Sequence, residues 1–249
     1  MRKSLNLLES SILLKMIYDI SPPITPNTAV WPGDNPLKIS PQAAFSSGDN
    51  YNLSTIETSL HIGAHVDAPL HMRNGDIPVD ELSLEYFLGP CQVITVDVPP
   101  GQEIYPHHLK TRIFESRVLF RTNSYGDLNR FSSDFNGLSI ELVGELHIQG
   151  VMTVGIDTPS VEIYGSSDML VHKTLFKREM GVLEGLMLRH VPDGIYELIA
   201  LPLRLKGLEA SPVRAILRKI DKKGPAEDNL LRQARPLPRT NRRPLTARL

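Results

Sequence analysis

The sequence predicts an α/β fold built on a mixed, barrel-like sheet. Segments rich in β-branched residues alternate with short helical segments, and several strand-like segments follow one another without a helix between them. That order disfavours a regular doubly wound sheet, in which a helix would connect each pair of parallel strands. The 249 residues are enough for one substantial core. We expect one folded domain at residues 17–220, with an N-terminal extension at 1–16 and a basic, disordered tail at 221–249.

Residue patterns place the expected elements along this domain. Pro32 and Gly33 predict a turn, while Ser139 and Gly150 mark the start and end of a helix. Pro106 fits the first turn of another helix. Strands are expected at 17–20, 52–60, 91–98, 117–121, 152–156, 181–188 and 194–203. Helices are expected at 82–88, 106–113, 140–149 and from Ser211-Pro212 to about residue 220, with a short helix or a loop at 168–177.

Charge separates the domain from its tail. The whole chain carries a formal net charge of -1, so it offers no general electrostatic reason to bind nucleic acid or an anionic membrane. Residues 221–249 instead contain eight Lys or Arg and three acidic residues, a charge of +5, together with four prolines. This composition is typical of a solvated, disordered appendage. The alternative is a tail that binds RNA or an acidic surface.

Other features favour a cytoplasmic protein. The single cysteine, Cys91, has no partner for an intramolecular disulfide and belongs to no CxxC pair. Polar residues interrupt the apolar residues near the N-terminus, so we expect no export signal. No apolar run approaches the roughly 18 residues that are needed to cross a bilayer.

The residues that carry chemistry concentrate in the segment 60–71, LHIGAHVDAPLH, which holds three of the eight histidines. His61, Gly63, His65 and Asp67 all occupy odd positions, so in an extended chain they share one face. Two imidazoles and a carboxylate suit Zn²⁺, Mn²⁺ or Fe²⁺. We therefore predict a metal site on one strand. His71 follows after a turn, where a general acid or base would lie.

Two further ligands are expected from elsewhere in the chain. Glu184 lies in an apolar stretch, where a carboxylate is costly unless it is paired or bound to a metal; alternatively, it faces solvent at a strand end. His172 is a candidate of the same kind. The competing interpretation is that all these histidines only make ordinary hydrogen bonds, but convergent titratable residues favour a functional site. The histidines at 107, 108, 147 and 190 are expected to be structural or exposed.

The segment His61–His71 also resembles the signature His-x-Gly-Thr/Ala-His-x-Asp-x-Pro-x-His of the cyclase-like metal-dependent hydrolases. Within that family the chain resembles the bacterial kynurenine formamidase branch over roughly residues 17–220. Ala64 replaces the threonine common in the wider family, and residues 166–172 match the branch less closely than their surroundings. The other matching segments are Val30-Trp-Pro-Gly-Asp34, Leu88-Gly-Pro-Cys91, Gly155-Ile-Asp-Thr-Pro-Ser160, Leu183-Glu-Gly-Leu186, Tyr196–Leu203 and Ala210–Ala215.

The resemblance implies a swivelling β/β/α domain that forms homodimers, in which a partner can help to complete the pocket. It implies two metal ions per subunit, usually zinc, with Mn²⁺ as the alternative. One ion would be held by His61, His65 and Asp67. Asp67 would bridge to a second ion held by His172 and Glu184. In addition, His71 would act as the catalytic proton shuttle, and Trp31 would line the substrate pocket.

The activity implied by this resemblance is hydrolysis of N-formyl-L-kynurenine to L-kynurenine and formate, a step in tryptophan breakdown. The nearest alternative is a sister hydrolase acting on isatin or another cyclic or aromatic amide. A third alternative is a catalytically silent metal-binding or interaction protein. The intact set of candidate ligands together with His71 disfavours this last class.

Overall fold

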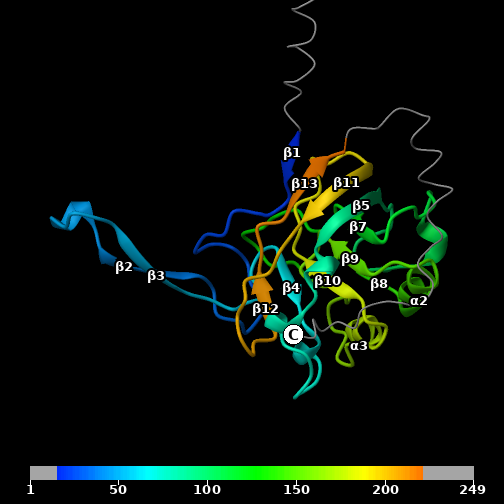
Figure 1. The fold of residues 1–249 in the computed structure, drawn as a ribbon, viewed down its shortest axis with the longest axis horizontal. Helices are drawn as coiled ribbons and strands as arrows, with labels where there is room; N and C mark the ends of the chain where they lie inside the picture. The colour runs from blue at the N-terminus through cyan, green and yellow to red at the C-terminus, as the bar shows by residue number, and fades with distance from the viewer. Residues whose placement is uncertain (1–15, 221–249) are drawn as a thin grey trace, which may run out of the picture.

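The structure of the protein is a computed structural model that describes residues 16–220. The predicted extension and tail lie outside these residues, apart from Met16. The centre of the fold is a curled nine-stranded sheet with the order β1-β13-β11-β5-β7-β9-β10-β4-β12 (Figure 1). The predicted α/β class with a mixed, barrel-like sheet is confirmed. In sheet order, the strands are β1 (Ile17–Asp19), β13 (Ile216–Lys219), β11 (Gly194–Ile199), β5 (Leu88–Thr95), β7 (Arg117–Arg121), β9 (Thr153–Ile156), β10 (Gly181–Glu184), β4 (His65–Asp67) and β12 (Ala210–Pro212).

Both faces of this sheet are apolar, because its middle strands β5, β7, β9 and β10 run parallel and are covered on both sides. Val118 and Val182 face one cluster, which also contains buried residues of the helices α2 (Ile140–Ile148) and α3 (Leu170–Lys177). Leu119 and Leu183 face the opposite way, into a second cluster. This second face bears neither of these helices and is enclosed by the curl of the sheet and by loops.

Local sequence signals placed the helix α2 correctly. The Ser139 hydroxyl accepts a hydrogen bond from the backbone N–H of Leu142 at 3.0 Å, which satisfies one free donor of the first turn. Gly150 follows the helix with φ +86, a left-handed conformation that favours glycine. The segment 168–177, predicted as a short helix or a loop, is the helix α3.

Three other helix predictions are wrong. The segment after Ser211-Pro212 forms strand β13, because its backbone pairs with both β1 and β11 and this pairing outweighs local preference. The helix expected from Pro106 is a single 3-10 turn at Pro106–His108. The helix expected at 82–88 is a 3-10 turn at Leu84–Tyr86, and Leu88 already pairs with Ile199 in the sheet. The remaining 3-10 turns are Phe45–Ser47, Pro69–His71 and Val79–Glu81.

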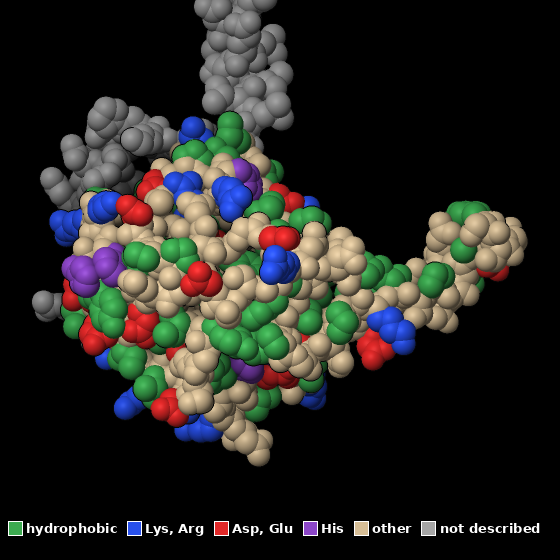
Figure 2. Space-filling model, turned by 180° about the vertical axis from the view of Figure 1, so that it is seen from behind, with side chains coloured by type: hydrophobic (Ala, Val, Ile, Leu, Met, Phe, Trp, Pro, Cys, Tyr) green, Lys and Arg blue, Asp and Glu red, His purple; other side chains and the backbone are tan. Residues whose placement is uncertain are grey.

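Outside the main sheet, β6 (Glu103–Ile104) pairs with β8 (Gly137–Leu138). The strands β2 (Lys38–Ala43) and β3 (Leu53–Glu57) form a separate hairpin that projects from the body of the molecule (Figure 1). Figure 2 shows apolar side chains along this hairpin. Within residues 16–220, no helix is both long and apolar enough to cross a lipid bilayer.

Candidate active site

Two neighbouring strands bring two carboxylates and an imidazole to one point. Strand β4 presents His65 and Asp67 on the same face, because side chains two residues apart point in the same direction. Strand β10 pairs with β4 in antiparallel register and places Glu184 directly opposite His65. The closest distance between these two side chains, from His65 Nε2 to Glu184 Oε2, is 3.2 Å. All three residues are buried, with Asp67 only 1% exposed.

His61 reaches the same point by a route that the sequence pattern did not predict. The prediction that residues 61–67 form one extended strand is wrong, since β4 begins only at His65. Gly63 has φ +62, which turns the chain before the strand. His61 nevertheless lies beside Asp67, with Nδ1 3.0 Å from Oδ1. The turn, and not an alternating strand face, therefore brings His61 to the carboxylate.

The helix α3 supplies the fifth member of the cluster. His172 Nε2 lies 3.4 Å from Asp67 Oδ2 and 3.1 Å from Glu184 Oε1. Two sets of candidate ligands result, and within each set the ligand atoms lie within 4.8 Å of one another. The first set is His61, His65 and Asp67, and the second is Asp67, His172 and Glu184. The structure thus brings together all five residues that the sequence analysis named as metal ligands, with Asp67 common to both sets.

Unsatisfied polar atoms indicate that these residues fit a divalent cation. Both Asp67 carboxylate oxygens and Nε2 of His61 and His65 are buried without a hydrogen-bond partner among the described residues. Asp67 Oδ1 lies 3.0 Å from His61 Nδ1 and 3.5 Å from His65 Nε2, close enough for charge pairing but not aligned as a hydrogen bond. Buried polar atoms of this kind are costly unless something binds them. Imidazole and carboxylate donors are those that zinc and manganese accept.

The pKa shifts within the cluster also indicate a site for a cation. Burial disfavours the charged form of His65, yet Glu184 and Asp67 outweigh it and raise the pKa of His65 to about 9. Burial likewise opposes protonation of His172, but Glu184 and Asp67 hold its pKa well above the usual value. Burial would raise the pKa of Asp67, whereas the neighbouring His61 and His172 hold it well below its usual range. Among protein groups alone, protonated imidazoles balance the carboxylates, and a divalent cation can replace those protons.

The two buried imidazoles are oriented by groups behind them. His65 Nδ1 lies 2.9 Å from the Gly63 carbonyl oxygen, which accepts its hydrogen and leaves Nε2 free toward the carboxylates. His172 Nδ1 lies 3.4 Å from Glu162 Oε1. Glu162 was not singled out in the sequence, although it follows the buried strand β9 by only a few residues.

His71 lies beside the cluster without joining either ligand set. It ends the 3-10 turn Pro69–His71, and its ring centroid is 4.3 Å from that of His61 and 6.0 Å from that of His172. Burial lowers the pKa of His71, so the imidazole is neutral near pH 7. A neutral imidazole at the edge of a metal centre can accept and return a proton.

A cavity of about 530 Å³ opens onto the cluster. Its wall includes members of the cluster and the neighbouring His71, namely His61, His65, His71, His172 and Glu184. Trp31 lies in the wall, and its ring centroid is 5.4 Å from that of Phe131 and 5.5 Å from that of Tyr164. Phe131 and Tyr125 also line the cavity, and the sequence analysis did not identify either. A wall that combines titratable and aromatic side chains is typical of a small-molecule site.

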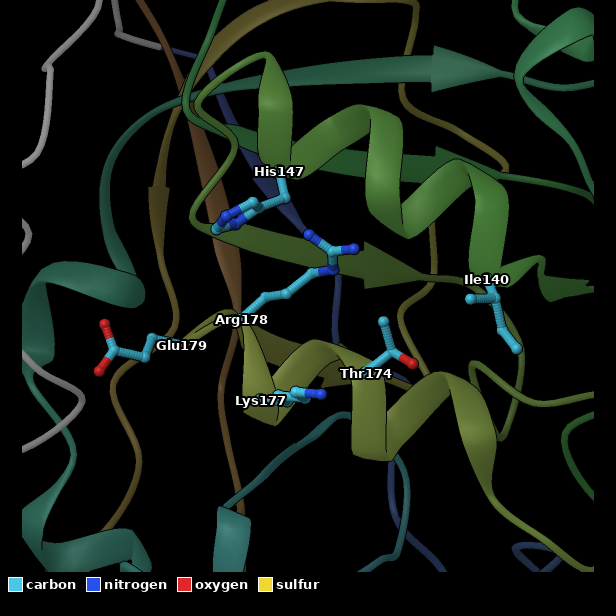
Figure 3. A pocket seen from close by; sticks show the side chains of 6 residues that line it. All are labelled: Ile140, His147, Thr174, Lys177, Arg178 and Glu179. Atoms are coloured by element: carbon cyan, nitrogen blue, oxygen red, sulfur yellow. The ribbon is translucent and has the colours of Figure 1, made fainter.

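A second cavity lies between α2 and α3 and contains no comparable cluster (Figure 3). Its basic side chains, His147, Lys177 and Arg178, come from the C-terminal ends of the two helices, where positive charge complements the backbone carbonyl groups. His147 thus lies outside the candidate active site, as do the largely exposed His107 and His190.

Comparison with known proteins agrees with this geometry. A protein-family model described as "putative cyclase" matches residues 18–163. The chain belongs to the cyclase family. One relative in this family, a Bordetella petrii protein named kynurenine formamidase, is 41% identical over 209 residues, which are 83% of this chain and 100% of that protein.

Solved structures of the cyclase family share the fold. A structure described as a potential metal-dependent hydrolase with cyclase activity superposes with a TM-score of 0.71 and 29% identity, covering 83% of this chain and 98% of that chain. Isatin hydrolase A from Labrenzia aggregata superposes with a TM-score of 0.66 and 24% identity, covering 88% of this chain and 100% of that chain. At that lower identity the likeness concerns the fold.

Proposed function

We propose that this cyclase-family protein is a metal-dependent arylformamidase that hydrolyses N-formyl-L-kynurenine to L-kynurenine and formate. The observation that carries the proposal is a cluster of imidazoles and carboxylates lining a cavity whose wall also includes Trp31, Phe131 and Tyr125. The cavity offers aromatic contacts for an aryl ring and polar groups for an amide. The relative named kynurenine formamidase supports this substrate.

In this proposal the centre takes two divalent ions, zinc or alternatively manganese. His61, His65 and Asp67 would hold one ion, and Asp67, His172 and Glu184 the other. When bound, such an ion lowers the pKa of a water ligand toward about 7 and supplies positive charge for a developing oxyanion. The unsatisfied oxygens of Asp67 support this assignment, because among the described residues neither has a hydrogen-bond partner and a cation would satisfy them.

The side chains of the protein would handle orientation and protons. Trp31 and its aromatic neighbours would pack against the ring of the substrate, which leaves the formyl group beside the titratable side chains of the wall. His71, neutral because it is buried, would accept a proton from the attacking water. It would return that proton to the aniline nitrogen as the C–N bond breaks, so formate and the free amine leave.

The test is formamidase activity on N-formyl-L-kynurenine, followed by the absorbance of the product, before and after chelation with zinc added back. We expect chelation to abolish turnover and zinc to restore it. A folded, zinc-loaded protein that does not turn over this substrate would contradict the proposal.

The second candidate is hydrolysis of isatin, favoured by the structural likeness to isatin hydrolase A. Isatin is a compact bicyclic amide, whereas N-formylkynurenine carries an amino-acid side chain and needs a longer cavity. Comparison of kcat/KM for the two substrates, measured on the same zinc-loaded protein, decides between them.

The proposal also includes a homodimer. The β2–β3 hairpin supports it, because Phe45 is 64% and Ile56 is 65% exposed, and isolated two-stranded hairpins are marginally stable in water. A second copy of the chain would cover these side chains. Sedimentation velocity at micromolar concentration is expected to give twice the 27.8 kDa of one chain, and a monomer would contradict this part of the proposal.

A further inference from the structure

Glu162 is a buried carboxylate behind the candidate metal centre, and only 3% of it is exposed. We propose that Glu162 is a positioning residue: it caps the N-terminus of helix α3 and also orients the His172 imidazole that this helix carries. The inference rests on the proposed metal site, because His172 is one of its candidate ligands.

The first half of the role follows from the start of α3. Met169, the residue at the N-cap, has φ +49 and offers no side-chain hydrogen bond to the helix. Glu162, which lies outside the helix, caps it instead. Its Oε1 accepts hydrogen bonds from the backbone N–H of Val171 at 2.7 Å and of His172 at 3.1 Å. These are the second and third residues of the helix, whose N–H groups have no partner within it. A carboxylate there also meets the positive end of the helix dipole.

The second half of the role follows from the imidazole ring. The same Oε1 lies 3.4 Å from His172 Nδ1, which donates its hydrogen toward the carboxylate. When a cation replaces the proton on Nε2, the hydrogen stays on Nδ1, and the lone pair of Nε2 faces Asp67 and Glu184, the candidate ligands in front of it. A carboxylate behind a ligating histidine fixes the tautomer and raises the basicity of the ring. Loss of such a partner typically weakens metal binding by 10- to 100-fold.

One side chain therefore couples the position of a helix to the direction of a ligand on it. The Ser166 hydroxyl donates to the second oxygen, Oε2, at 2.9 Å, and so holds the carboxylate in place. The hydrogen bond between Val161 N–H and Glu184 Oε1, at 2.6 Å, connects the residue next to Glu162 to another candidate ligand. The segment 161–166 thus contacts two members of the second candidate ligand set.

The experiment measures metal binding without substrate, so that it is independent of the amide hydrolysed. Full-length wild type, Glu162→Gln and Glu162→Ala are stripped of metal, titrated with Zn²⁺ and Co²⁺, and followed by metal content and by the visible absorption of Co²⁺. Glu162→Ala is expected to weaken binding 10- to 100-fold at one of the two sites and to change the Co²⁺ spectrum. Glu162→Gln keeps an acceptor oxygen but not the charge, so we expect a smaller loss of affinity and a metal-free Tm close to wild type.

A matched control separates positioning from simple destabilisation. Ser139→Ala removes the cap of helix α2, which carries no candidate ligand, and should lower Tm while leaving metal affinity unchanged. The inference is overturned if Glu162→Ala lowers Tm but binds both ions like wild type. If Glu162→Ala does not fold, unchanged affinity and an unchanged Co²⁺ spectrum in Glu162→Gln overturn it instead. Wild type that binds no metal would overturn the proposed function and, with it, this inference.

Discussion

The candidate metal centre and the β2–β3 hairpin depart from ordinary protein packing in opposite directions. At the centre, the Asp67 oxygens are buried and find no hydrogen-bond partner within residues 16–220; on the hairpin, Phe45 and Ile56 expose apolar side chains to solvent. Each arrangement is costly for an isolated chain, by desolvation in one case and by apolar hydration in the other. Each also indicates the chemistry that would relieve it. The centre needs cations, and the hairpin needs an apolar surface.

The largest expected effect is at the shared carboxylate. Asp67→Asn keeps the shape of the side chain but removes its charge from both candidate ligand sets. We expect loss of bound metal and a fall in activity of about 10³-fold or more, because metal ions supply several kcal/mol of transition-state stabilisation. Metal analysis and kcat/KM on the same preparation test this. Normal metal content in the variant would contradict the role of Asp67 as a ligand. It would also contradict the interpretation that the buried carboxylate at the centre needs a cation.

The next effect separates proton transfer from metal binding. His71→Ala should retain metal, since His71 belongs to neither ligand set, but lose activity by about 10²- to 10⁴-fold. The same metal analysis serves as the internal control. An unchanged rate would remove His71 from the mechanism.

The hairpin is tested by adding charge to its apolar side chains. Ile39 and Ile56 face each other across the two strands, and we expect the double variant Ile39→Glu, Ile56→Glu to be monomeric. The matched control is Ile148→Glu, at an isoleucine that is 78% exposed on α2, across the body of the molecule from the hairpin (Figure 1). Sedimentation velocity measures the oligomeric state of both variants. If the control dissociates and the hairpin variant does not, the dimer uses another surface.

The smallest expected effect is on the pH dependence of Tm, which should differ between chelated and zinc-loaded protein. In chelated protein, the pKa of His65 is raised to about 9, which stabilises the folded state. This stabilisation is complete at pH values below the pKa of His65 in the unfolded chain, and it is lost as the pH rises toward about 9. Tm of chelated protein should therefore fall by several degrees between pH 6.5 and 9.5. Zinc competes with protons for the imidazole, so the increase in Tm on adding zinc should grow over the same range. Parallel profiles with and without zinc would argue against His65 as a ligand.

The sequence was most informative where neighbouring residues carry the signal. The spacing of His65 and Asp67 placed both on one strand face, and Ser139 with Gly150 bounded a helix correctly. The same local reasoning failed at His61, because a glycine with positive φ turned the chain. It also failed at Ile216–Lys219, where pairing with two strands overrode an expected helix.

By itself, then, the sequence determined the fold class, the type of ligand chemistry and the strand that carries its centre. Family resemblance assigned the candidates His172 and Glu184 to a second ion, and the tertiary structure places His172 Nε2 3.1 Å from Glu184 Oε1. Only that structure identified Glu162 behind His172 and assembled the aromatic wall around Trp31. The reason is physical. Local patterns depend on neighbours along the chain, whereas strand pairing between β4 and β10 and the packing of α3 bring together residues more than a hundred positions apart.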